Sequence, residues 1–296
     1  MIVDKPEIFF NEFPYKYWLY KAEMIKSLLD NNEKFQDSNG TLEIFDGSLK
    51  EYQQMLKYEL HFTYYHQAEA LFELIFALEK LDDKYTWLIL SESYRHQEKY
   101  TEKINEIAEG SNKLFDKEVK FKSGKSLSFI EWLLYDEYGE QISSKDLETS
   151  LKKAKEIIQI IAEDLADKAQ YNAFKHGMRV LPLWKYFSIE TKDKEKKKVK
   201  FDLENSFTFL SFPKDRSKID EVTIGYSPDQ DLLKINLITL LMKGIIGVRK
   251  DKYFNKEKGQ LFHFVDVDFK KKIQKANIGI HRLVHTTHFD NYNKSK

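Results

Sequence analysis

The sequence contains no cysteine and few residues that interrupt regular structure, with 5 Pro and 11 Gly among 296 residues. The absence of Cys excludes a disulfide-stabilised scaffold, a Cys-ligated zinc site, an iron–sulfur cluster and a Cys nucleophile. No stretch approaches the roughly 20 uninterrupted apolar residues of a membrane span. The first residues, MIVDKPEIFFNEF, lack the basic start and the long apolar run of a signal peptide. We therefore expect a cytoplasmic protein without membrane insertion.

Apolar and aromatic residues are plentiful. The hydrophobic fraction is 42%, the charged fraction is 32%, and the chain carries 4 Trp, 17 Tyr and 22 Phe. This composition is typical of a globular protein with a sizeable core and excludes disorder for most of the chain.

The neutral total charge hides two segments of opposite sign. Residues 1–178 carry 23 Lys and Arg against 33 Asp and Glu, a net charge of −10, whereas residues 179–296 carry 25 against 15, a net charge of +10. The basic segment can contact a polyanion, or it can face the acidic segment within the fold or a dimer, and we favour the second interpretation. The Lys-rich stretch TKDKEKKKVK (191–200) is read as a solvated loop.

Apolar residues recur at helical spacing along the first part of the chain. The predicted helices cover residues 14–30, 48–80 and 86–109, a segment that follows the capping-box pattern Ser128-x-x-Glu131, and a fifth helix from Ser143 or Ser144 to the stop at His176-Gly177. A hairpin is expected at 119–129. Several antiparallel helices joined by short loops predict a bundle over residues 1–180.

Beyond Pro182, apolar residues recur at every second position instead of at helical spacing. The predicted strands are 184–189, 199–203, 207–212, 221–226 and 260–269. Between the last two, Ser227-Pro228-Asp229 is expected to cap a long apolar helix. The sequence thus predicts an α+β protein: a helical bundle over 1–180, then a smaller antiparallel sheet with one long apolar helix over 181–296, packed on the bundle.

The sequence lacks the motifs of several common catalytic and cofactor-binding sites. KSGKS (122–126) has no Gly four residues before its Gly-Lys pair, so a turn is expected there instead of a phosphate-binding loop. The chain has no Gly-x-Ser-x-Gly elbow and no Gly-rich dinucleotide fingerprint. We expect no cofactor.

Two sets of His residues are candidate metal sites. His66-x-x-Glu69 and Glu73, with Glu92 and His96, suggest a carboxylate bundle, but the Glu-x-x-His pairs of that architecture are absent. The spacing of His281, His285 and His288 can bring three imidazoles together on a helix, although a partly exposed surface segment is the preferred interpretation. We therefore predict no metal site, and a metal-dependent bundle protein is kept as a second alternative.

The end of the fifth predicted helix gathers polar and basic residues. Asn172 and His176 lie four residues apart, one helical turn, and Lys175 and Arg179 lie within a turn of the His. A His can act as general acid or base near neutral pH, and the flanking cations can bind a phosphate. The alternative is a structural helix end, in which Asn172 and His176 bond to neighbouring loops.

A multi-helix bundle whose late helix ends in Asn-x-x-x-His-Gly resembles the HEPN superfamily (higher eukaryote and prokaryote nucleotide-binding). That resemblance implies a prokaryotic toxin or phage-defence role and an RNA-cleaving site assembled across a homodimer. It implies catalytic roles for His176 and Asn172. From the residues themselves, we expect substrate contacts from Lys175 and Arg179 and from the neighbouring Tyr171. The family has Arg before the polar residue, where this chain has Tyr171.

The function predicted from these residues is that of an RNA-binding protein or metal-independent endoribonuclease. The first alternative is a catalytically inert dimerisation or interaction module, which a protein partner or antitoxin would bind. The departure at Tyr171 favours this alternative, because a cation there would stabilise the phosphate charge that develops during cleavage.

Overall fold

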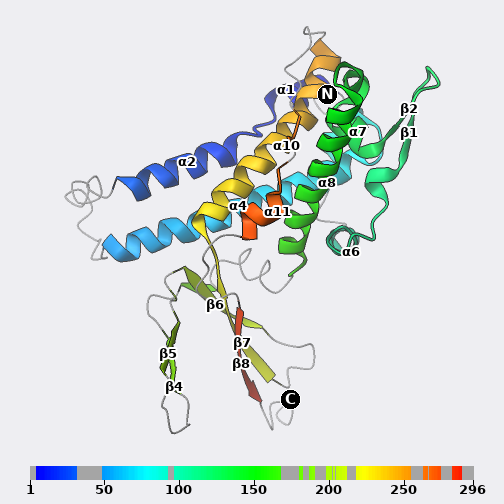
Figure 1. Cartoon of the computed structure of the whole chain (residues 1–296). Helices are drawn as coiled ribbons and strands as arrows, with labels where there is room; N and C mark the ends of the chain where they lie inside the picture. Colours follow the sequence, from blue (N-terminus) through cyan, green and yellow to red (C-terminus); the bar gives the residue numbers. More distant parts are fainter. Residues whose placement is uncertain are drawn as a thin grey trace. The chain divides into compact units, whose positions relative to one another are not determined.

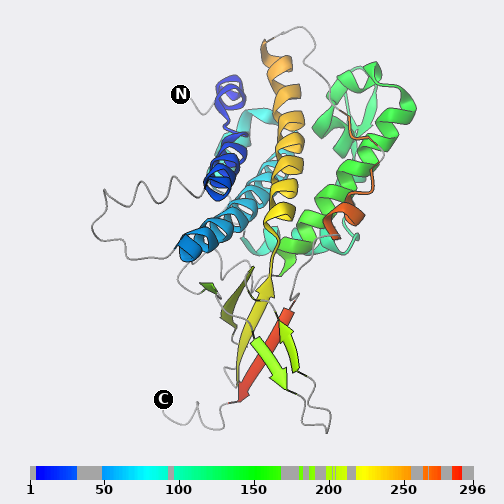
Figure 2. The ribbon, with the colours of Figure 1, turned by 60° about the vertical axis from the view of Figure 1, so that its left-hand side comes forward.

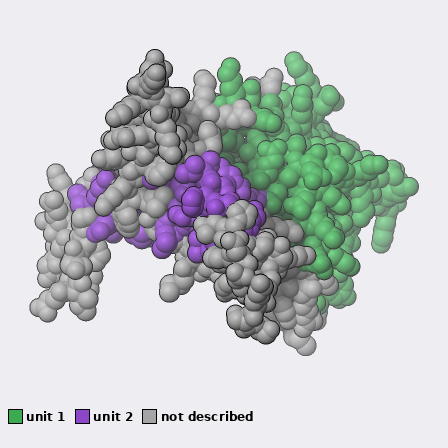
Figure 3. All heavy atoms as spheres, turned by 90° about the horizontal axis from the view of Figure 1, so that it is seen from below, with its two compact units in different colours: residues 1–20, 64–166, 233–275 green, residues 21–63, 167–232, 276–296 purple. Residues whose placement is uncertain are grey.

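The chain is an α+β protein in which helices predominate (Figure 1). The computed structural model describes residues 5–31, 49–92, 97–167, 180–182, 187–190, 198–201, 203, 205–211, 218–254, 263–265, 267–274 and 282–288. These residues belong to two compact units (Figure 3). Unit 1 comprises residues 1–20, 64–166 and 233–275, and unit 2 comprises 21–63, 167–232 and 276–296.

The α-helices of the described residues differ widely in length. They are α1 (Pro6–Glu12), α2 (Tyr17–Asp30), α4 (Leu49–Leu78), α5 (Thr86–Ser91), α6 (Gln97–Ala108), α7 (Phe129–Leu134), α8 (Ser144–Ala166), α10 (Pro228–Phe254) and α11 (Phe269–Gln274). The helices predicted at 14–30 and 48–80 are confirmed as α2 and α4. Neither α2 nor α4 contains a Gly or Pro that would interrupt its apolar pattern.

The third predicted helix, 86–109, is wrong as a single element. Helix α5 ends at Ser91, and α6 begins at Gln97. Trp87 and Leu88 of α5 are each 41% exposed, so the apolar residues of this short helix are only partly buried. Its predicted end is correct, since Gly110 follows α6 with a left-handed φ of 70° that suits glycine.

Unit 1 contains a small hairpin and a capped helix. Strands β1 (Glu118–Lys120) and β2 (Ser126–Ser128) pair antiparallel, which confirms the predicted hairpin and the turn at KSGKS. Gly124 lies in this turn with φ 86°. Ser128 caps α7 by accepting a hydrogen bond from the Glu131 amide at 3.4 Å, as the capping-box pattern predicts. Helices α6 and α11 both pack against α8.

The sheets of unit 2 are antiparallel (Figure 2). The strand order of the larger is β3-β6-β7-β8, that is Val180–Pro182, Ser206–Ser211, Lys218–Gly225 and Arg282–His288. Strands β4 (Phe187–Glu190) and β5 (Lys198–Phe201) form a separate hairpin. The strands predicted at 184–189, 199–203, 207–212 and 221–226 are therefore confirmed within a few residues.

Two predictions for the C-terminal part are wrong. The predicted strand 260–269 is absent from the described residues 263–265 and 267–268, and helix α11 begins at Phe269 after Asp268 accepts a hydrogen bond from the Lys271 amide at 2.8 Å. The second wrong prediction is the long apolar helix. Helix α10 is long, but it buries the polar residues Asp231, Lys234, Thr239 and Arg249. Its Pro228 start and its Ser227 cap are as predicted.

The compact units do not divide the chain near residue 180. Helices α2, α4 and α10 each contribute residues to both units, so each unit is assembled from three separate segments. Among the described residues, no helix combines the length and the apolar character needed to cross a bilayer.

Candidate functional site

The residues predicted to act on RNA lie outside the described residues. Tyr171, Asn172, Lys175, His176 and Arg179 all fall between Asp167 and β3, and their geometry is not part of the description. The helix expected to carry these residues is, however, shorter than predicted. Helix α8 ends at Ala166, so the prediction that one helix continues to Gly177 is wrong.

Asp167, the residue after α8, has a non-helical conformation. Its Oδ2 accepts a hydrogen bond from Arg282 Nη1 of β8 at 2.7 Å, an ion pair within unit 2. The two residues lie 115 positions apart, so the sequence pattern alone does not reveal this pair.

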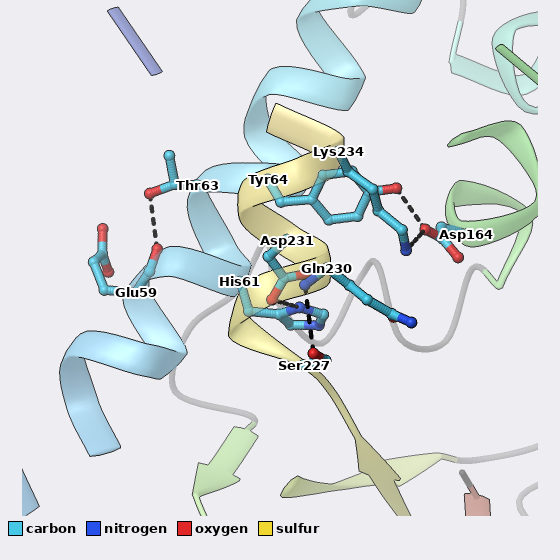
Figure 4. A network of polar contacts seen from close by, with 9 residues as sticks. All are labelled: Glu59, His61, Thr63, Tyr64, Asp164, Ser227, Gln230, Asp231 and Lys234. Atoms are coloured by element: carbon cyan, nitrogen blue, oxygen red, sulfur yellow. Dashed lines mark hydrogen bonds and ion pairs between the residues drawn. The ribbon is translucent and has the colours of Figure 1, made fainter. Parts of the chain in front are cut away.

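Unit 2 contains a buried His–Asp pair (Figure 4). His61 Nδ1 of α4 lies 2.9 Å from Asp231 Oδ2, in the first turn of α10, and the two side chains are 7% and 3% exposed. An ionised carboxylate only accepts hydrogen bonds, so Nδ1 carries the proton of the bond. The N-terminal turn of a helix also favours a negative side chain such as Asp231.

Aromatic rings surround this imidazole. The ring of His61 stacks on Tyr226 with centroids 4.8 Å apart, and it packs against Phe207 at 5.7 Å. Burial, and secondarily the charge of Glu59, raises the pKa of the nearby Tyr58 phenol to about 12. A carboxylate that fixes the tautomer of a His is also found in general-base sites. Here both partners are sequestered in the core, so we interpret the pair as a structural connection within unit 2.

A second polar group, in unit 1, joins three helices. Asp164 Oδ2 of α8 accepts hydrogen bonds from Tyr64 Oη of α4 and from Lys234 Nζ of α10, each at 2.5 Å. The ammonium of Lys234 also lies 4.9 Å from the centroid of the Tyr64 ring. Figure 4 shows both side chains pointing toward Asp164. Since Tyr64 is only 1% exposed, this arrangement holds helices together within the core.

Among the described residues of unit 1, the most deeply buried charge is that of Arg249 of α10. Its side chain is 2% exposed, and its Nε lies 3.4 Å from Asp83 Oδ1. Its Nη1 donates to the carbonyls of Leu133 and Ile245 at 2.9 and 2.8 Å. The guanidinium lies over the Trp132 ring at 4.5 Å, a favourable cation–π distance.

Further ionisable groups adjoin this pair. Lys252 Nζ and Tyr253 Oη both donate to Asp83 Oδ2, at 3.0 and 3.2 Å. Burial raises the pKa of Asp136, and the charges of Lys252 and Arg249 oppose that effect. Burial lowers the pKa of the Arg249 guanidinium, while Asp83 and Asp136 raise it. Asp83 is shared by Arg249, Lys252 and Tyr253, which indicates a structural network, whereas Asp136 Oδ1 is buried without a hydrogen-bond partner among the described residues.

The candidate metal ligands do not converge among the described residues, where no group of three or more His, Asp and Glu side chains is placed to hold a metal ion. His66 is exposed, and His96 lies outside the described residues.

The C-terminal His residues lie on a strand and not on a helix. His285 and His288 belong to β8, and His285 is exposed, as expected for a surface segment. The helix on which the three imidazoles could converge is therefore absent from the described residues 282–288. His281 lies outside the described residues.

Comparison of the chain with protein-family models, with curated proteins and with solved structures finds no match.

Proposed function

We propose that the chain is an RNA-binding protein or a metal-independent endoribonuclease of a prokaryotic defence or toxin type, as its resemblance to the HEPN superfamily implies. The observation that carries this proposal is the grouping of Asn172, Lys175, His176 and Arg179 within one short segment. That segment supplies a titratable imidazole, an orienting amide and two cations, which are the groups that metal-independent RNA cleavage needs.

In the proposed reaction, His176 accepts the proton of a ribose 2′-hydroxyl, and the 2′-oxygen attacks the adjacent phosphorus. The bond from phosphorus to the 5′-oxygen breaks, and that oxygen takes up a proton. The products are a 2′,3′-cyclic phosphate and a 5′-hydroxyl end. Asn172 orients the imidazole, while Lys175 and Arg179 hold the phosphate oxygens. The partner in the proposed assembly is a second copy of the chain, since two-fold dimers are the commonest oligomers.

The test is incubation of purified protein with a mixed RNA pool in EDTA, followed by a denaturing gel. We expect cleavage by the wild type and loss of cleavage in His176→Ala. The matched control is His285→Ala, which removes an exposed imidazole from β8 and should leave cleavage unchanged. Equal cleavage by His176→Ala and wild type would overturn the assignment, provided that circular dichroism shows both variants folded.

The second candidate is an inert interaction module, favoured by Tyr171 at the position where the family has Arg. This candidate predicts no RNA cleavage by wild type with or without metal, together with a stoichiometric protein partner in a pull-down. Cleavage that depends on His176 would eliminate it.

A further inference from the structure

Unit 1 contains a cavity of about 340 Å³ between α4, α5 and α6. Its apolar wall consists of Phe76 and Ala77 of α4, Ile89 of α5 and Tyr100 of α6. The rings of Phe76 and Tyr100 meet edge to face with centroids 5.3 Å apart, and Tyr100 Oη donates to the carbonyl of Glu69 at 3.1 Å. This wall is therefore fixed in position before any ligand binds.

The acidic side chains of the cavity are already engaged. Glu79 forms an ion pair with Lys103, whose ammonium also lies 5.1 Å from the centroid of the Phe76 ring. Glu73 and Glu92 each interact with other groups of the protein. The lining thus carries three carboxylates and three ammonium groups, of which Glu79 and Lys103 are paired with each other.

Two lysines of the same lining are not engaged. Lys80, just after α4, and Lys99 of α6 are exposed, and neither makes a hydrogen bond or ion pair within the part of the chain that the structure describes. The cavity therefore offers a preformed apolar wall together with two free ammonium groups. A volume of this size lies at the small end of the range for sites that bind small molecules.

A neighbouring cavity of about 680 Å³ shares Glu79 and Lys103 but differs in chemistry. Leu114 is its one apolar lining residue. Its acidic groups are paired, since Asn112 Nδ2 donates to Glu106 Oε2 at 2.7 Å and Lys155 Nζ lies 2.5 Å from Asp116 Oδ1. Its lining contains no aromatic ring, unlike that of the smaller cavity.

We propose that the smaller cavity binds a small organic anion with a flat apolar ring and one carboxylate. The ring packs against Phe76, Ile89 and Tyr100, and the carboxylate accepts hydrogen bonds from Lys80 and Lys99. This inference does not depend on the proposed ribonuclease activity, and each can fail alone.

The test uses the full chain and three probes in isothermal titration calorimetry. Indole-3-acetate carries both ring and carboxylate, indole-3-acetamide is its uncharged counterpart, and acetate lacks the ring. We expect indole-3-acetate to bind with a Kd of about 1 mM or tighter and the other two probes to bind at least several-fold more weakly.

The variants separate the two halves of the site. Lys80→Ala and Lys99→Ala should each weaken indole-3-acetate binding by about two- to fivefold, the range expected for an exposed ion pair, and the double variant should bind acid and amide equally. Ile89→Trp should abolish binding by filling the cavity. Lys145→Ala, which removes an exposed lysine of α8, is the matched control and should bind as wild type does.

Three results would overturn the proposal: no indole-3-acetate binding at 10 mM, about ten times the expected Kd; equal affinity of wild type for acid and amide; or unchanged affinity in the folded double lysine variant. The lysine variants keep the proposal falsifiable if Ile89→Trp does not fold, because both side chains are exposed and their removal does not disturb the core.

Discussion

At the residue scale, Arg249 and Asp83 form an ion pair in the core of unit 1, with side chains only 2% and 4% exposed. We expect Arg249→Met to destabilise the protein by roughly 3 kcal/mol, because removal of one partner of a buried ion pair leaves the other charge uncompensated. The carbonyls of Leu133 and Ile245 would also lose their donor. Urea denaturation of the variant and the wild type measures this difference in the free energy of unfolding.

The matched control for that prediction is Lys252→Met. Lys252 also bonds to Asp83, but its side chain is 47% exposed, so its loss should cost less than about 1 kcal/mol. The double variant Arg249→Met with Asp83→Asn should be more stable than the sum of the two single effects predicts. Similar destabilisation by Lys252→Met and Arg249→Met would contradict the assignment of the main stabilising role to the buried guanidinium.

Asp136 is expected to reduce stability near neutral pH. Burial raises its pKa in the folded state above the unfolded value, so the folded protein binds the proton more tightly. Stability therefore increases as the pH falls through the folded-state pKa, and the penalty of the ionised form is present above it. Asp136 also has a left-handed φ of 48°, a conformation that Asn tolerates.

Asp136→Asn should accordingly raise the midpoint of thermal unfolding at pH 7. This gain should disappear in acid, below the unfolded pKa of the carboxyl group, where Asp136 is protonated in both states. Melting curves recorded from pH 7 down to pH 3 measure the effect. A variant that is less stable than wild type at pH 7 would show that the attraction of Asp136 for Arg249 and Lys252 exceeds the effect of burial.

At the element scale, two glycines of unit 1 offer opposite outcomes for the same substitution. Gly110 ends α6 with φ 70°, and Ala there should destabilise the protein by about 1 kcal/mol. Gly247 lies within α10, where an added Cβ meets no atom within 4 Å, so Ala should stabilise the helix by up to about 1 kcal/mol. Thermal unfolding of both variants tests the pair, and effects of the same sign would contradict it.

The elements differ in how far their sequences determine them. Helix α4 is predictable because thirty residues keep helical spacing without Gly or Pro. Strand β8 is missed because the spacing of His281, His285 and His288 suggests a helix, although Val284, Thr286 and Thr287 are β-branched and favour a strand. In 260–269 the alternating pattern predicts a strand, whereas Asp268 provides the cap that begins α11.

The polar pairs of the core are less predictable than the helices that carry them. His61 lies on the apolar face of α4, a signal that a buried His needs a partner, yet that partner, Asp231, is 170 residues away. Asp83 and Arg249 are similarly distant in sequence, in different segments of unit 1. A single sequence indicates which residues require partners, but only the folded chain determines which residues meet.

At the scale of the whole molecule, contiguous sequence ranges do not describe the compact units. A change of apolar period near Pro182 suggests domains of 1–180 and 181–296, whereas the described units draw on three segments each. The reason is that α4 and α10 are long enough to contribute residues to both units. Local periodicity therefore predicts the type of each element, but it cannot predict the unit to which each part of a long helix belongs.

The distribution of charge leads to a prediction about RNA binding by the whole chain. The formal net charge is zero, so long-range attraction to RNA is not expected, and binding must come from local cations such as Lys175 and Arg179. For single-stranded RNA, each phosphate contact contributes about −0.7 to the slope of log affinity against log salt concentration. Removal of both cations should make that slope less negative by about 1.4.

The measurement is fluorescence anisotropy of a labelled single-stranded RNA over a series of KCl concentrations, with His176→Ala as the background so that the RNA stays intact. Lys175→Ala with Arg179→Ala is compared in this background with Lys145→Ala, the exposed lysine of α8. An unchanged slope in the double variant would show that the predicted cluster does not contact phosphate. If the double variant binds RNA more weakly and with a less negative slope, the RNA backbone contacts residues 170–179, whether or not the chain cleaves it.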